Sequence, residues 1–267
     1  MTAWDTCSLC PRLCRSACPV ATGSGREAAV PTWIAWTIRG WGAGQLSQEL
    51  AAEAASLCTD CGACQEHCHL GRPLPELLRG ARTRLLPPPA LEPLEPIEGE
   101  GSLVVIEADA RPLAAWLQRA LGRSVRRWST PDRLGIAAVE HPVFTHRAAR
   151  LREAVADLEV VVADGGIATV LQRADIAFSW LHEVLPELVA DRTIASCRTG
   201  GRRLGLACCG AAGPLARHHP EDAERVGALF LERCGGGVLL DARCREHLRR
   251  CGASVHDVVD RLGGEES

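Results

Sequence analysis

The placement of the cysteines restricts this chain more than any other feature. The chain has fourteen cysteines, and eight of them form two runs of four before residue 70. So many cysteines indicate either the disulfide framework of a secreted protein or thiolate ligands for metal in a reduced protein. Cysteines in two short runs are not distributed along the chain as a disulfide framework would be. The opening MTAWDTCSLC also lacks the basic segment followed by an apolar segment that forms a signal sequence. We therefore expect bound metal and a reducing, cytoplasmic location.

The spacing within each run is typical of four-iron clusters. The first run, Cys7–Cys18, has gaps of two, three and three residues, and the second, Cys58–Cys68, has gaps of two, two and three. Such a run supplies three thiolates to one [4Fe–4S] cluster, and in two-cluster ferredoxins the fourth cysteine binds the other cluster. We therefore predict two clusters, one bound by Cys7, Cys10, Cys14 and Cys68, the other by Cys58, Cys61, Cys64 and Cys18.

Structural zinc is the alternative metal, because zinc sites are also built from cysteine pairs two residues apart. Two runs of four are uncommon in zinc knuckles, and Pro19 after the last cysteine of the first run is a ferredoxin feature. Two details depart from the ferredoxin pattern. Three residues separate Cys10 from Cys14, and His69 stands where a proline usually follows the second run. Neither departure removes a ligand.

A stretch rich in proline and glutamate marks the expected domain boundary. Residues 87–101 have the composition of a semi-rigid linker. Before it, helices are expected at Thr32–Gly40 and Leu46–Leu57, between the cysteine runs. The predicted domains are a helical domain at 1–86, the linker, and a second domain at 102–267.

The second domain is expected to alternate strands and helices. Short apolar, largely β-branched runs at Leu103–Ile106 and Glu159–Ala163, and one containing Leu239-Leu240, predict strands, and Pro220–Arg233 predicts a helix. This alternation favours a largely parallel sheet. The chain as a whole is therefore predicted to be α+β.

The helical stretch between the two cysteine runs resembles the α-helical ferredoxin domain. That domain occurs in heterodisulfide reductase small subunits and in the iron–sulfur subunits of glycolate and glycerol-3-phosphate dehydrogenases. The resemblance covers residues 5–80. It implies an electron-transfer subunit of a larger oxidoreductase complex, with a flavoprotein dehydrogenase as its redox partner.

Cys208-Cys209-Gly210, with Cys244 downstream, resembles the cysteine-rich CCG domain of the same families. The usual last cysteine is His247 here, and the upstream Cys197 lies unusually close to the pair. Three interpretations remain open. The site binds a third cluster, with His247 as a substitute ligand; or it binds zinc or mononuclear iron; or it is decayed. The candidate ligands are Cys197, Cys208, Cys209, Cys244 and His247.

Families with this domain carry the motif twice, and the resemblance implies a degenerate first copy. Leu103–Asp109, Ala138–Pro142 and Asp164–Ile167 stand where its three cysteine-bearing segments would lie. All thiolates are missing there, so this half would serve as scaffold.

The charge and the motifs restrict the function. A formal net charge of −3 gives no reason to expect nucleic acid as a partner, and no apolar run approaches the ~18 residues of a membrane span. No catalytic constellation and no dinucleotide fingerprint is visible. The leading hypothesis is a redox relay. The alternatives are a disulfide or quinone reductase acting at the CCG site, and a scaffold subunit whose clusters only stabilise assembly.

Overall fold

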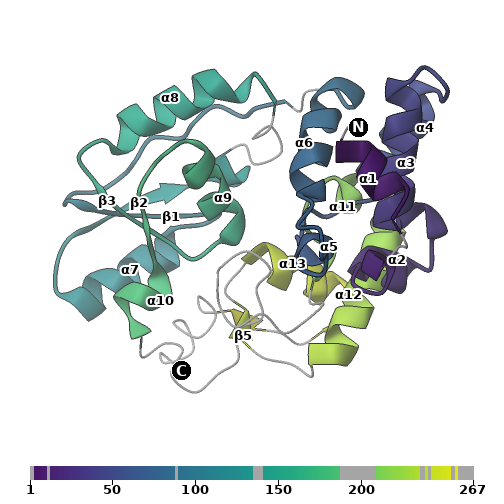
Figure 1. Cartoon of the computed structure of the whole chain (residues 1–267). Helices are drawn as coiled ribbons and strands as arrows, with labels where there is room; N and C mark the ends of the chain where they lie inside the picture. Colours follow the sequence, from purple (N-terminus) through teal and green to yellow (C-terminus); the bar gives the residue numbers. More distant parts are fainter. Residues whose placement is uncertain are drawn as a thin grey trace. The chain divides into compact units, whose positions relative to one another are not determined.

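The computed structural model divides the chain into two compact units, each built from separate stretches of sequence (Figure 1). The structure describes residues 3–10, 13–87, 90–134, 141–186, 208–234, 238–239, 242–253 and 256–257. We call 1–88, 203–235 and 247–253 the helical unit. The remaining stretches, 89–202, 236–246 and 254–267, form the sheet unit.

The helical unit is built from short helices around the two cysteine runs. The two helices expected between the runs are confirmed: α3 spans Pro31–Gly42 and α4 spans Gln48–Ser56. Proline at the first turn starts α3, and the Ser47 side chain accepts a hydrogen bond from the Leu50 amide to cap α4. The other elements are α1 (Ala3–Ser8), η1 (Leu13–Arg15), α2 (Pro19–Ser24), η2 (Glu27–Ala29), α5 (Ala63–Glu66), α6 (Leu74–Leu85), α11 (Leu215–His218) and α12 (Pro220–Cys234).

The sheet unit contains a four-stranded parallel sheet of order β2-β1-β3-β4. The strands expected near residues 103 and 159 are confirmed as β1 (Leu103–Glu107) and β3 (Glu159–Val162). A second, two-stranded parallel sheet pairs β5 with β6. The remaining elements are α7 (Arg111–Leu121), β2 (Val125–Ser129), α8 (Phe144–Val155), α9 (Gly165–Arg173), β4 (Ser179–Trp180), α10 (Leu181–Val184), β5 (Val238–Leu239), β6 (His256–Asp257) and α13 (Ala242–Arg250), which starts in this unit.

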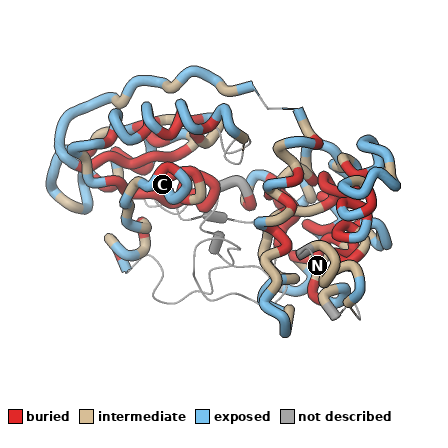
Figure 2. The backbone as a smooth tube through the Cα atoms, turned by 45° about the horizontal axis from the view of Figure 1, so that its top comes forward, coloured by how far each residue is buried: buried red, intermediate tan, exposed pale blue. Residues whose placement is uncertain are grey.

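Both faces of the four-stranded sheet are covered by helices. All five residues of β1 are buried, whereas β2 and β4 also carry exposed or half-buried residues; Figure 2 colours the chain by burial. Leu103 and Val105 pack with α7 and α10, whereas Val104 and Ile106 pack with α8 and α9. Alternate side chains of a strand point to opposite faces, so this continuous apolar run suits a buried parallel strand. The α+β fold class is confirmed.

The expected degenerate repeat falls partly on described residues. Asp164 caps α9, because its carboxylate accepts hydrogen bonds from the Gly166 and Ile167 amides at 2.6 and 3.0 Å. Arg133 bonds the other oxygen of this fully buried side chain at 3.0 Å. Residues 138–140 lie outside the described part of the chain. The repeat itself stays a prediction, and Asp164 holds a helix start where the first copy would have a cysteine.

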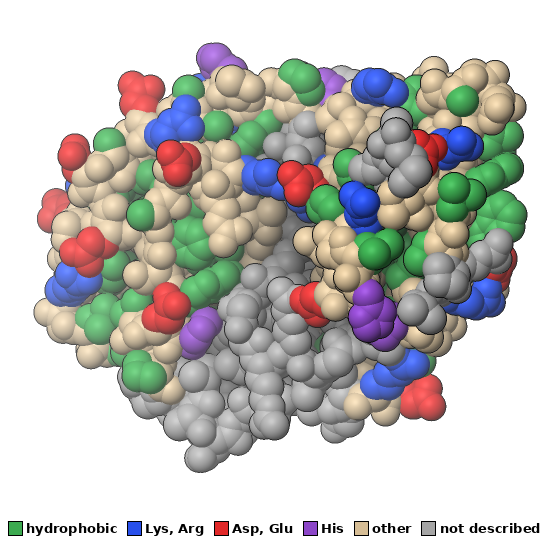
Figure 3. All heavy atoms as spheres, in the orientation of Figure 1, with side chains coloured by type: hydrophobic (Ala, Val, Ile, Leu, Met, Phe, Trp, Pro, Cys, Tyr) green, Lys and Arg blue, Asp and Glu red, His purple; other side chains and the backbone are tan. Residues whose placement is uncertain are grey.

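Charged side chains of both signs are interspersed on the face drawn in Figure 3. No helix in the described ranges has both the length and the hydrophobicity needed to cross a bilayer.

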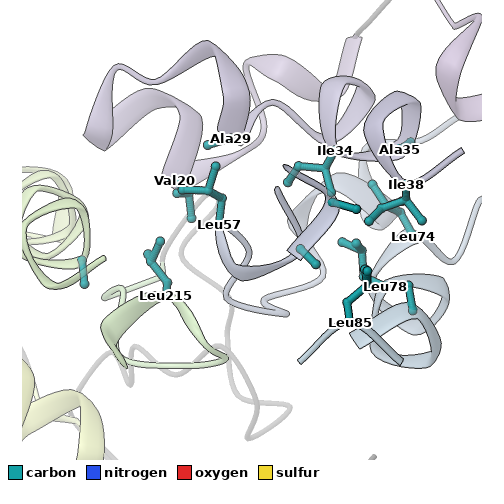
Figure 4. Close-up of a cluster of buried hydrophobic side chains, with 14 of the residues drawn as sticks. Val20, Ala29, Ile34, Ala35, Ile38, Leu57, Leu74, Leu78, Leu85 and Leu215 are labelled. Carbon is teal, nitrogen blue, oxygen red and sulfur yellow. The ribbon is translucent and has the colours of Figure 1, made fainter. Parts of the chain in front are cut away.

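The core of the helical unit includes residues from far along the chain. Leu215, Ala223 and Val226 belong to the same buried cluster as Val20 and Leu57, and Figure 4 shows Leu215 beside those two side chains. Helix α12 packs against α2 at a glycine: a Cβ on Gly23 would lie 2.9 Å from the Val226 Cα.

The compact units therefore differ from the domains drawn on the sequence. The sequence placed everything after residue 101 in the second domain, whereas 203–235 and 247–253 belong to the helical unit. Buried leucine and valine packing drives this assignment, and an ion pair between Arg26 and Asp222 at 2.9 Å adds to it.

Candidate metal centre

The first four predicted ligands line one cavity. Cys7 comes from α1, Cys14 from η1, and Cys10 and Cys68 from the segments that follow α1 and α5. The two ends of the cysteine region therefore meet at this cavity, as the predicted exchange of fourth ligands requires.

The other four predicted ligands line a second cavity. Cys58, Cys61 and Cys64 approach it from the second run, and Cys18 reaches it from the start of α2. The rest of this lining is largely apolar and includes Val20, Ile34, Leu57, Leu74 and Leu78. Four thiols, the donor set predicted for each cavity, fit a [4Fe–4S] cluster.

The two cavities share part of their lining. Pro31, Cys64 and Leu74 contribute to both. Two redox groups held there would be neighbours, because only the side chains of this shared lining would separate them.

Burial makes the thiols hard to ionise in the absence of metal. Desolvation raises the pKa of Cys18 to about 12 and that of Cys58 to about 11. Burial also raises the pKa of the Cys7 and Cys14 thiols. Metal binding needs thiolates, so loading these sites must release protons and supply positive charge to offset the cost of desolvation.

Arg82 of α6 holds the loop that carries Cys58. Its guanidinium donates to the Ala55 and Cys58 carbonyl oxygens at 2.8 and 2.9 Å and to the Asp60 carboxylate at 2.8 Å. The Arg82 and Asp60 side chains are each only 10% exposed. A buried guanidinium with these three hydrogen bonds, one of them to a carboxylate, fixes the direction of the loop.

Cys208 lies beside the second cavity. This thiol is 2% exposed and donates to the Thr59 hydroxyl at 3.3 Å. The pKa of the Cys61 thiol is raised well above its usual value, first by hydrogen bonding with Cys208 and then by burial. The start of the Cys-Cys-Gly segment is therefore packed on the loop of the second run, a role that its spacing did not indicate.

Gly213 allows this close packing. Its φ is +64°, and a Cβ there would lie 2.6 Å from the Cys58 carbonyl oxygen. Only glycine combines this backbone conformation with this approach.

Cys209 and His247 gather elsewhere in the helical unit, around Gly227. A Cβ on Gly227 would lie 3.2 Å from the His247 Nε2, 3.4 Å from the Cys209 carbonyl oxygen and 2.7 Å from the Cys251 Sγ. The His247 Nε2 lies 3.0 Å from the Ala223 carbonyl oxygen, which can only accept a hydrogen bond, so Nε2 carries the proton. Cys251 had no role in the sequence interpretation.

The proposed CCG ligand set stays a prediction. Cys208 contacts the second run, Cys209 and His247 lie by Gly227, and the buried Cys244 lies one turn before His247 in α13. Cys197 lies outside the described residues. Among the residues that are described, no group of three or more His, Cys, Asp or Glu side chains is arranged to hold a single metal ion.

Comparison with known families agrees with the two cavities. Residues 3–71 match the family model described as a 4Fe-4S dicluster domain. No curated protein and no solved structure matches the chain significantly. The matched segment contains all eight cysteines of the two runs. The chain is therefore an iron–sulfur protein with a helical, ferredoxin-like N-terminal domain, and its role is in electron transfer.

Proposed function

We propose that the helical unit carries two [4Fe–4S] clusters and relays electrons between a flavoprotein dehydrogenase and a downstream acceptor. The observation that carries this proposal is the pair of cysteine-lined cavities with a shared lining. When bound, each cluster supplies a one-electron redox centre. The protein supplies the thiolates, the buried surroundings and the neighbouring position of the two sites.

The first test is the metal content of the protein purified without oxygen. Two clusters predict about eight irons and eight acid-labile sulfides per chain, with EPR signals after reduction. About twelve of each would show a third cluster and bring the CCG segment into the redox path. Far fewer than eight irons, with zinc present, would contradict the proposal.

Alanine variants test the exchange of the fourth ligands. If Cys18 binds with the second run, Cys18→Ala and Cys61→Ala should lose the same EPR component. Cys14→Ala and Cys68→Ala should lose the other. Cys251→Ala, which removes a thiol outside both cavities, is the matched control and should keep both. Loss of the same component in Cys14→Ala and Cys18→Ala would show that each run binds its own cluster.

The flavoprotein partner and the larger complex rest on the family resemblance. Purification of the tagged, full-length chain from its natural host without oxygen should recover a flavin-containing protein in constant ratio. Recovery of the chain by itself, with both clusters reducible only by added dyes, would argue against this partner.

A reductase acting at the Cys-Cys-Gly segment is the second candidate. The contact of Cys208 with the loop of the second run favours it, because this contact joins the segment to a cluster cavity. Cys209→Ala separates the two functions. A relay through the two clusters keeps electron transfer to its partner, whereas a reductase loses turnover of a disulfide or quinone substrate.

A further inference from the structure

The two cavities differ in exposure. The first is rimmed by the exposed residues His67, His69 and Leu70, and Leu70 is 60% exposed. None of the residues lining the second cavity is exposed.

The two cavities also differ in charge. Arg72 lines the first cavity, and its buried Nε has no hydrogen-bond partner in the described part of the chain. The Arg72 guanidinium is therefore a charged group at the first cavity, and its Nε–H is available to the ligands there.

The arginine beside the second cavity is paired with a carboxylate. Arg82 is bonded to two carbonyl oxygens and paired with the buried Asp60 carboxylate. The lining of the second cavity contains no charged group besides its thiolates. Thr59 and Cys208 add hydrogen bonds on this side, but neutral hydrogen bonds are about half as strong as those of a charged donor.

A cluster with four thiolate ligands is an anion, and one-electron reduction makes it more negative. A nearby cation and access to water stabilise the reduced form, whereas an apolar, buried cavity without a cation destabilises it. Reduction potentials of iron–sulfur clusters follow these factors.

We propose that the cluster bound by Cys7, Cys10, Cys14 and Cys68 has the higher reduction potential, and that Arg72 is the residue that raises it. This inference rests on the proposed two-cluster relay. Electrons then reside on the cluster nearer to solvent, and the buried cluster is the more reducing of the pair.

EPR-monitored potentiometric titration of the full-length, anaerobically purified protein tests the inference. We expect two components of unequal potential, and Cys10→Ser should alter the higher one. Arg72→Gln should shift that component to lower potential and leave the other unchanged. Arg72→Lys, which keeps the charge, should lie near the unsubstituted protein. Arg84→Gln is the matched control, because it removes an equal charge from an exposed side chain that stacks on Trp41.

Each other outcome overturns the inference. If the EPR component of the first cavity titrates at or below the potential of the second, the inference is contradicted. This comparison uses the unsubstituted protein, so it holds even if Arg72→Gln fails to bind one cluster. An equal shift in Arg72→Gln and Arg84→Gln would show a general charge effect. Eight irons with no shift in Arg72→Gln would contradict the role of Arg72 alone. Far fewer than eight irons in the unsubstituted protein would overturn the proposed function as well.

Discussion

Gly213 shows how one residue connects the Cys-Cys-Gly segment to the cluster region. Its backbone lies in the left-handed region, and the Cys58 carbonyl occupies the space where a side chain would begin. The Cys58–Cys61 loop can therefore stay in place only while position 213 lacks a Cβ. Gly25 has a similar φ of +68°, but a Cβ there would meet nothing within 4 Å.

The pair Gly213 and Gly25 allows a matched prediction. Gly213→Ala should destabilise the protein by roughly 1–3 kcal/mol more than Gly25→Ala, because both carry backbone strain but only the first also clashes. Gly213→Ala should also hold less iron at the second cavity. Thermal unfolding followed at the iron–sulfur absorbance measures both effects. Equal unfolding temperatures for the two variants would show that the close approach is unimportant.

At the scale of elements, polar contacts hold the α11–α12 segment on the helical unit. His219, between these helices, lies 2.7 Å from the Ser56 hydroxyl through Nε2 and 3.4 Å from the Arg26 guanidinium through Nδ1. The guanidinium can only donate, so Nδ1 accepts and the imidazole is neutral. Burial, and then the charge of Arg26, lower the pKa of His219 below its usual 6.5.

This lowered pKa predicts a sign for the pH dependence. The unfolded chain protonates His219 at higher pH than the folded one, so the contribution of His219 is full above about pH 6.5 and is lost as the pH falls through the folded pKa. The unfolding temperature should therefore decline below about pH 6.5. His219→Gln should flatten that decline, whereas His146→Gln, at an exposed position of the sheet unit, should not. An unchanged profile in His219→Gln would contradict this assignment.

At the scale of the whole molecule, the two units are interleaved in sequence. The chain leaves the helical unit after the second run, builds the sheet unit, and returns with Leu215 in the core beside Val20 and Leu57. Cluster binding should thus depend on residues that follow the second run by about 150 positions.

A pair of leucine substitutions tests this dependence. Leu215 and Leu113 are both fully buried, one in each unit, so alanine at either should cost roughly 2–5 kcal/mol of local stability. Leu215→Ala should lower iron content and the temperature at which the clusters are lost. Leu113→Ala should lower the unfolding temperature of the sheet unit and spare the iron content. Equal iron loss in both variants would mean that the units do not unfold separately.

The sequence by itself located the cysteine-rich cluster region and the main elements. Chain geometry ties Cys58, Cys61 and Cys64 to a common neighbourhood, because only two residues separate each pair. Short β-branched runs likewise predicted β1 and β3. Side chains on both faces of these strands pack among apolar residues, so both faces favour apolar side chains.

Only the tertiary structure decided which other residues reach those ligands. Arg72 and Thr59 belong to no motif, and Cys208 was grouped with the CCG residues although it packs on the second run. The sequence also did not predict that 203–235 belong to the helical unit. Local periodicity and spacing encode the hydrogen bonds and packing of near neighbours. Contacts across more than a hundred residues depend on how buried surfaces fit, which no local pattern contains.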